Sequence, residues 1–138
     1  MRPARILLAD DHSLILEGFR NVLEPDYEIV GAVTDGKSLL DEAVRLKPDL
    51  IVLDIVMPQL SGLDAAREIR KILPEAKLLF VTMHVNRAYL EEALKAGGAG
   101  YVLKSSARED ILEAVEAVLA GKTYVTPSIL AKGSGASP

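Results

Sequence analysis

The sequence predicts an α/β protein with an open, parallel β-sheet covered by helices on both faces, and three observations support this prediction. Five short apolar runs are distributed along the 138 residues, and stretches with helical periodicity separate them. Several runs are continuous rather than alternating, as is typical of strands buried on both faces. The regular alternation of strand and helix indicates βαβ units joined by right-handed crossovers.

The individual elements follow from the same patterns. Asp35 and Ser61 are suited to cap the N-termini of the second and third helices. Ser106, with Glu109 three residues later, predicts a capping box at the start of the fifth helix, and Gly121 is placed to end it. The expected strands are residues 6–9, 29–33, 50–53, 78–81 and 101–103. The expected helices are residues 13–24, 36–46, 62–73, 86–96 and 107–120.

The composition limits the classes of function. Hydrophobic residues make up 49% of the chain, enough to build one buried core. The net charge of −4 and the aromatic content of 4% disfavour nucleic-acid binding and base stacking. The absence of Cys excludes disulfides and Cys-ligated zinc. No apolar stretch is long enough to span a bilayer and no signal peptide is apparent, so we expect a cytoplasmic protein without membrane contact.

The end of the chain differs in composition from the rest. Gly, Ser and Pro predominate from residue 133 onward, a mixture typical of a flexible end or a linker. We therefore expect one domain over residues 1–121 and a C-terminal extension or linker stub over residues 122–138.

Polar side chains follow the predicted strands at the points where four of them end. Asp10 and Asp11 follow the first strand, Asp54 the third, Thr82 the fourth and Lys104 the fifth. Because the carboxyl ends of parallel strands meet at one edge of a sheet, we expect these side chains to share one cleft. Each residue alone has an ordinary explanation, such as a helix cap, a strand residue or a surface lysine. Their common position at strand ends favours a site.

The acidic residues of this cleft predict a magnesium site. Several carboxylates a few ångströms apart repel each other, and a hard divalent cation with oxygen ligands removes that repulsion. We expect Asp11 and Asp54 to bind Mg²⁺ directly and Asp10 to act through water. The backbone carbonyl of Val56 is a further candidate ligand.

The remaining residues of the cleft suit phosphoryl transfer. A carboxylate such as that of Asp54 can act as a nucleophile and form an aspartyl phosphate. Lys104 can neutralise one phosphoryl oxygen, and the hydroxyl of Thr82 can donate a hydrogen bond to another.

These residues resemble the response-regulator receiver domain of bacterial two-component signalling. The motif comprises Asp10-Asp11, the run from Asp54 to Pro58, Gly62, Thr82 and Lys104, and the likeness covers residues 4–121. The resemblance implies a flavodoxin-like sheet with strand order 2-1-3-4-5. It also implies that Asp54 accepts a phosphoryl group from a sensor histidine kinase, and that the domain is a switch rather than an enzyme.

Shorter motifs are similar to the NarL/FixJ branch of this family. They are Leu8–His12, Thr82–His84 and Gly121–Tyr124. Members of this branch usually carry a C-terminal helix-turn-helix domain. The sequence ends before such a domain, so we expect contact with DNA only through an output domain outside it.

The resemblance also implies a switch and an interface. Thr82 and Tyr101 are the expected switch pair, and the fourth helix, fifth strand and fifth helix form the expected responding surface. Val56, Met83 and His84 flank the site and are expected to tune access to the phosphoryl group. Phosphorylation-dependent homodimerisation is a further expectation.

Two other functions remain open at this stage. A phosphatase of the haloacid-dehalogenase type also uses a strand-end Asp and Mg²⁺, but generally has a second Asp two residues later, where this chain has Val56. A binding module with the same fold but without phosphorylation is the second alternative. The complete set of site residues argues against it.

Overall fold

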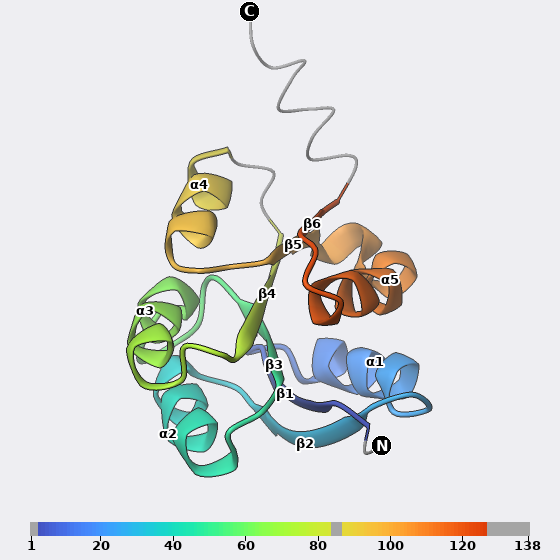
Figure 1. Ribbon diagram of the computed structural model, residues 1–138, viewed down its shortest axis with the longest axis horizontal. Coiled ribbons are helices and arrows are strands. Elements are labelled where there is room, and N and C mark those ends of the chain that lie inside the picture. The colour runs from blue at the N-terminus through green and yellow to red at the C-terminus, as the bar shows by residue number, and fades with distance from the viewer. Residues whose placement is uncertain (1–2, 84–86, 127–138) are drawn as a thin grey trace, which may run out of the picture.

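The computed structural model describes residues 3–83 and 87–126 as an α/β fold with one parallel sheet (Figure 1). The strand order is β2-β1-β3-β4-β5-β6, and every neighbouring pair is parallel. The strands are β1 (Arg5–Ala9), β2 (Glu28–Val33), β3 (Leu50–Asp54), β4 (Lys77–Thr82), β5 (Gly100–Leu103) and β6 (Tyr124–Val125). The predicted order 2-1-3-4-5 is therefore confirmed, with one strand added beyond β5.

Helices cover both faces of the sheet. In Figure 1, α1 and α5 lie on one side, and α2, α3 and α4 lie on the other. The helices are α1 (Ser13–Leu23), α2 (Gly36–Leu46), α3 (Gly62–Ile72), α4 (Arg87–Lys95) and α5 (Ala107–Leu119), with a short 3₁₀ helix, η1 (Lys104–Ser106), before α5. All predicted helices and strands are present, and their ends lie within one residue of the predicted positions.

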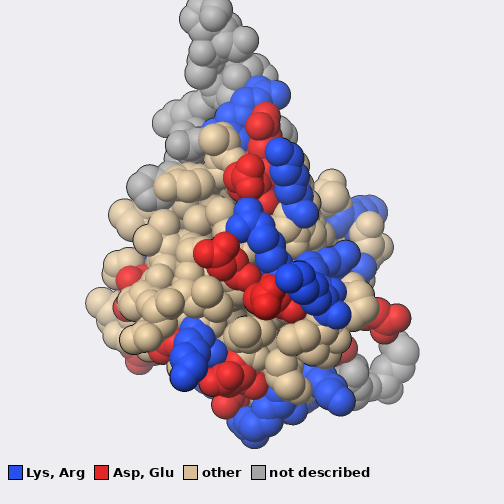
Figure 2. Space-filling model, turned by 90° about the vertical axis from the view of Figure 1, so that its left-hand side faces the viewer, with Lys and Arg blue, Asp and Glu red and all other residues tan. Residues whose placement is uncertain are grey.

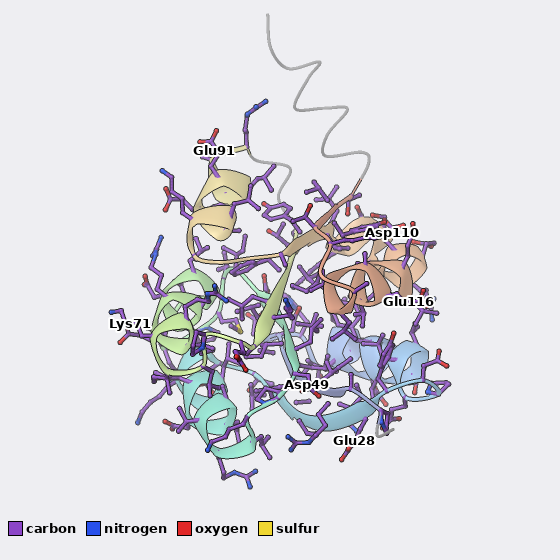
Figure 3. The ribbon with its side chains drawn as sticks, in the orientation of Figure 1. Glu28, Asp49, Lys71, Glu91, Asp110 and Glu116 are labelled. Atoms are coloured by element: carbon purple, nitrogen blue, oxygen red, sulfur yellow. The ribbon has the colours of Figure 1, made fainter. Side chains whose placement is uncertain are left out.

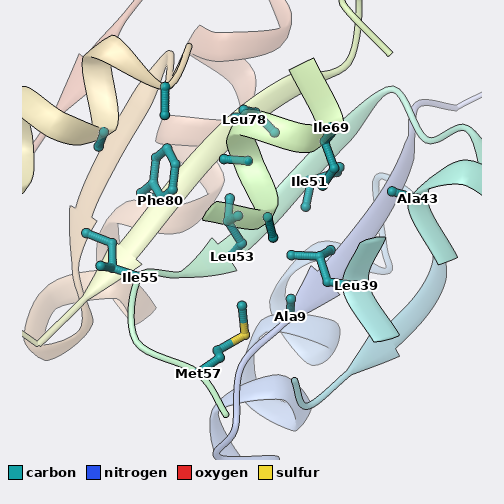
Figure 4. Packing of buried hydrophobic residues seen from close by; sticks show 14 of the residues in the cluster. Ala9, Leu39, Ala43, Ile51, Leu53, Ile55, Met57, Ile69, Leu78 and Phe80 are labelled. Carbon is teal, nitrogen blue, oxygen red and sulfur yellow. The ribbon is translucent and has the colours of Figure 1, made fainter. Parts of the chain in front are cut away.

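The continuous apolar runs are explained by two hydrophobic cores, one on each face of the sheet. Successive strand residues point to opposite faces, so Ile51 and Leu53 pack toward α2 and α3, while Leu50 and Val52 pack toward α1 and α5. Figure 4 shows the first core, where residues such as Leu39 and Ile69 from the helices meet the strand residues. A strand buried on both sides needs apolar residues at every position, which is the pattern in β3.

Local signals place most helix ends. The carboxylate of Asp35 accepts a hydrogen bond from the amide of Ser38 at 2.7 Å, as predicted for an N-cap. The hydroxyl of Ser61 accepts one from the amide of Asp64 at 3.1 Å. Gly121, two residues after the last residue of α5, has a φ of +85°, which is the left-handed conformation typical of a helix stop.

The capping box predicted at Ser106 is wrong. Ser106 precedes α5, but its side chain makes no capping hydrogen bond, and its buried hydroxyl has no hydrogen-bond partner among the described residues. The reason is that η1 leads directly into α5, so Ser106 has a φ of −118° and a ψ of 6° instead of an extended backbone.

The sheet also continues beyond residue 121. Tyr124 and Val125 form β6, which pairs in parallel with Gly100 and Tyr101 of β5. A strand of two residues is too short to produce a recognisable apolar run in the sequence. Within residues 3–83 and 87–126, no helix is both long and apolar enough to cross a membrane.

Candidate functional site

The predicted site residues meet at the carboxyl edge of the sheet. Asp54 and Thr82 are the last residues of β3 and β4, Asp10 directly follows β1, and Lys104 directly follows β5. Asp10, Asp54 and Thr82 are only 1%, 5% and 0% exposed. The fold therefore buries two carboxylates and a hydroxyl at this edge, where their interactions are stronger than at a surface.

The ammonium group of Lys104 holds the two buried carboxylates together. Its Nζ donates a hydrogen bond to Asp54 Oδ2 at 2.8 Å and another to Asp10 Oδ1 at 3.1 Å. Asp10 Oδ2 also lies 2.8 Å from Nζ, as an ion contact outside hydrogen-bonding geometry. Burial alone would lower the pKa of Lys104, but the hydrogen bonds and charges of Asp10 and Asp54 raise it. Lys104 is therefore a fixed positive charge beside Asp54.

Burial has the opposite effect on the carboxyl group of Asp54. Burial raises the pKa of Asp54 above its ordinary value, and the hydrogen bond and charge of Lys104 offset only part of this increase. The nearby charge of Asp10 raises it further. A cation bound next to Asp54 would favour its ionised form, which is the form that can act as a nucleophile.

Asp11 and His12 form the exposed side of the acidic cluster. The side chain of Asp11 is 34% exposed, and His12 Nδ1 lies 3.1 Å from Asp11 Oδ1 and 3.0 Å from Asp10 Oδ1. The amide of His12 also donates to Asp10 Oδ1 at 2.9 Å. His12 was not among the predicted site residues, although its position directly after the two aspartates was a usable signal.

The acidic residues suit a divalent cation. Asp10, Asp11, His12 and Asp54 each offer one ligand atom, and these atoms all lie within 4.8 Å of one another. Asp10 Oδ2 is buried and accepts no hydrogen bond from the described residues, so it has a lone pair available for a ligand. A set dominated by carboxylate oxygens fits a hard cation of the Mg²⁺ or Mn²⁺ type.

The loop after β3 fixes the backbone of Asp54. The amide of Gly62 donates to the carbonyl of Ile55 at 2.7 Å, and a Cβ at Gly62 would lie 1.8 Å from the carbonyl oxygen of Asp54. Only glycine allows this approach. The amide of Val56 donates to Asp54 Oδ1 at 3.3 Å. The contact at Val56 is thus made by its amide, and its predicted carbonyl ligation stays a prediction.

Of the three residues expected to tune access to the phosphoryl group, the structure describes Val56 and Met83. The side chains of Val56 and Met83 are exposed, at 53% and 68%. His84 lies outside the described residues. The tuning role of all three stays a prediction.

The expected switch residues are in contact. Tyr101 is 1% exposed, and its hydroxyl group is hydrogen-bonded to Thr82. Burial raises the pKa of Tyr101 to about 12, with the Thr82 hydrogen bond lowering it and Tyr89 adding a smaller increase. A shift at Thr82 would therefore reach a buried side chain of β5.

Comparison with known proteins identifies the class. The family model described as the response regulator receiver domain matches residues 6–116. The chain therefore belongs to the response-regulator receiver family of two-component systems. Domains of this family are typically switches rather than enzymes.

The similar proteins narrow the branch to LuxR- and NarL-type regulators. The chain is 34% identical over 127 residues to "Transcriptional regulatory protein DegU" of Brevibacillus brevis, which covers 91% of this chain and 54% of that protein. It is 39% identical over 124 residues to "Oxygen regulatory protein NreC" of Staphylococcus epidermidis, covering 88% of this chain and 57% of the relative. The chain thus spans somewhat more than half the length of these curated relatives.

Solved structures agree with this assignment. A LuxR-family two-component response regulator from Aurantimonas sp. SI85-9A1 has a TM-score of 0.88 and 37% identity, with 93% of each chain covered. The signal receiver domain of NarL from Mycobacterium tuberculosis has a TM-score of 0.83 and 32% identity, covering 88% of this chain and 100% of that one. The fold and branch predicted from the sequence are confirmed.

Proposed function

We propose that this receiver accepts a phosphoryl group on Asp54 from a sensor histidine kinase. The observation that carries the proposal is the buried contact of 2.8 Å between Lys104 Nζ and Asp54 Oδ2, beside the buried carboxylate of Asp10. A nucleophilic carboxylate, a fixed ammonium group and a cation-binding acid pair are the parts that phosphoryl transfer requires.

The transfer uses these residues in distinct roles. An oxygen of Asp54 attacks the phosphorus of the phosphohistidine, the P–N bond breaks, and the imidazole leaves with its electron pair. Lys104 neutralises one phosphoryl oxygen, since its ammonium group already lies beside Asp54. Thr82 donates its hydroxyl to another. The domain thereby assists its own phosphorylation, and water attacking the same phosphorus returns it to the free acid.

We assign the cation to Mg²⁺ held by Asp10, Asp11 and Asp54, with the Val56 carbonyl as a further ligand. When bound, Mg²⁺ supplies positive charge that offsets the carboxylates and the incoming phosphoryl oxygens. The partly exposed Asp11 and the buried Asp54 are the direct ligands in this proposal, and Asp10 acts through water.

The phosphoryl group would act on the surface through Thr82 and Tyr101. Drawing the Thr82 hydroxyl toward the phosphate removes the hydrogen bond that Tyr101 now makes, so β5 and its neighbours α4 and α5 repack between two populated states. We propose that this surface controls transcription through a helix-turn-helix output domain of a longer protein. The receiver domain covers residues 1–121 in this scheme, and residues 122–138 are a C-terminal extension whose first part, β6, adds to the receiver sheet.

The test is phosphorylation by a small phosphodonor. The protein is incubated with Mg²⁺ and acetyl phosphate, and its intact mass is recorded beside an Asp54→Asn variant and an EDTA control. One added phosphoryl group in the wild type alone supports the proposal. Mg²⁺ binding without an adduct favours a phosphatase or a very short-lived phosphate, and neither binding nor adduct favours the unphosphorylated binding module.

A further inference from the structure

One edge of β5 pairs with β4, and the opposite edge is covered by a later segment of the same chain. Residues 124–126 lie along β5, beside α5 in Figure 1. The amide of Tyr124 donates to the carbonyl of Ala99 at 3.0 Å, and the amide of Thr126 donates to the carbonyl of Tyr101 at 3.0 Å. The segment is therefore bonded to the backbone of the expected switch residue.

Thr126 makes a second, less usual contact with β5. It is a polar residue only 2% exposed, and its Oγ1 accepts a buried hydrogen bond of 3.1 Å from the amide of Leu103. In a continued β-ladder the amide of Leu103 would donate to a backbone carbonyl of the neighbouring strand. Here it donates to the side-chain hydroxyl of Thr126 instead. Without it the buried amide of Leu103 would lose this partner, which is costly. Leu103 directly precedes Lys104, so this contact lies one residue from the phosphoryl site.

The side chains of β6 fix the segment on both faces of the sheet. Val125 packs against the core that contains Tyr101, and Tyr124 packs against the core under α1 and α5. The position of the segment thus depends on the backbone of β5 and on the buried packing of Tyr101.

We propose that the edge of β5 is a docking surface for residues 124–126 and that phosphorylation of Asp54 releases them, with Thr126 as the anchoring residue. The inference rests on the proposed function of Asp54. Thr126 makes hydrogen bonds to Tyr101 and Leu103. Tyr101 is in turn hydrogen-bonded to Thr82, and Leu103 directly precedes Lys104 in the chain. Movement of Thr82 and Lys104 toward a phosphoryl group would shift both partners and weaken the docking.

Release of this segment would be transmitted toward the C-terminus. The curated relatives are longer than this chain, which covers 54% of one and 57% of another. A strand that undocks from the receiver frees the connection to any domain C-terminal to it. Whether residues 124–126 are bound to the edge of β5 would then depend on whether Asp54 is phosphorylated.

Amide hydrogen exchange of the 138-residue chain, measured by NMR with Mg²⁺ and with or without acetyl phosphate, tests this inference. Intact mass in parallel reports the phosphoryl group. We expect the amides of Leu103 and Thr126 to exchange about tenfold faster in the phosphorylated protein, with those of β1 unchanged. An adduct with unchanged or slower exchange at both amides would overturn the inference.

Two variants separate this inference from the function of Asp54. Thr126→Val keeps the shape but removes the acceptor, so the Leu103 amide should exchange fast in both states; Thr123→Val, at an exposed residue, is the matched control. Thr82→Ala removes the bond to Tyr101 without any phosphate. If neither an adduct nor Mg²⁺ binding is found, the proposed function fails, and faster Thr126 exchange in Thr82→Ala still supports the docking link. Exchange at Thr126 that stays at the wild-type rate in Thr82→Ala contradicts it.

Discussion

At the scale of single residues, the site depends on one buried ammonium group. Lys104 Nζ contacts Asp10 and Asp54 at 2.8 Å each, and the three side chains are between 1% and 7% exposed. A buried ion pair of this kind contributes little net stability when complete, but removing one partner leaves uncompensated charge. The buried pair of Asp10 and Asp54 therefore depends on a positive charge beside it, supplied by Lys104 or by a bound cation.

Replacing Lys104 should make the fold dependent on the cation. We expect Lys104→Met to lower the free energy of unfolding by about 3 kcal/mol in EDTA, because Asp10 and Asp54 lose their partner. Mg²⁺ should restore much of this loss. Chemical denaturation with and without Mg²⁺ measures both effects, and Lys122→Met serves as the exposed control. Equal stability of Lys104→Met and the control in EDTA would contradict the role of Lys104.

The raised pKa of Tyr101 leads us to expect that the free energy of unfolding falls at alkaline pH. Its pKa rises from 10.0 to about 12 because the phenol is buried. The folded state thus favours the neutral phenol, so this contribution to stability is complete below pH 10 and is lost as the pH rises toward 12. Tyr101→Phe should lose less stability over this range than the wild type, as followed by denaturation at several pH values. Parallel curves for the two proteins would exclude the effect.

At the scale of elements, the sequence predicts the regular parts of the fold well. Long periodic helices and buried strands have strong patterns, and side-chain caps such as Asp35 act locally. The pattern fails where tertiary context decides: η1 displaces the capping box at Ser106, and β6 is too short to recognise. The site residues could be placed because parallel strands end at one edge, whereas His12 was missed although it directly follows Asp10 and Asp11.

Two glycines in helices should respond oppositely to substitution. A Cβ at Gly62 would lie 1.8 Å from the carbonyl oxygen of Asp54, whereas nothing lies within 4 Å of one at Gly18. We expect Gly62→Ala to destabilise the protein by about 3 kcal/mol through overpacking. Gly18→Ala should stabilise it by about 0.5–1 kcal/mol through helix propensity. Thermal unfolding measures both, and similar changes in the two variants would show that the loop after β3 is not tightly fixed.

At the scale of the whole molecule, the charged surface is mixed in sign. Figure 2 shows Lys and Arg interleaved with Asp and Glu over the face formed by α2, α3 and α4. Arg67 of α3, for example, contacts Asp64 and also Glu92 of α4, each at 2.9 Å. Figure 3 places charged side chains such as Lys71, Asp110 and Glu116 at the rim of the molecule. Such a surface suits polar, reversible contacts better than a permanent interface.

The surface formed by α4, β5 and α5 is the one through which we predict assembly. We expect phosphorylation to promote a homodimer through α4, β5 and α5, where α4 carries the exposed pair Arg87 and Glu91. Sedimentation velocity with Mg²⁺ and acetyl phosphate should show a larger species for the wild type and not for Asp54→Asn. A monomer under all conditions, at concentrations well above those used for mass measurement, would refute this expectation.

The most direct test of the central claim identifies the modified atom. After incubation with Mg²⁺ and acetyl phosphate, borohydride reduces an acyl phosphate to an alcohol and thereby converts the modified aspartate to homoserine. Peptide mass spectrometry then locates that residue. We expect homoserine at position 54 and not at the other carboxylates of the site, Asp10 and Asp11. Homoserine at either of those positions, or none at all in a protein whose intact mass shows the phosphoryl group, would contradict it.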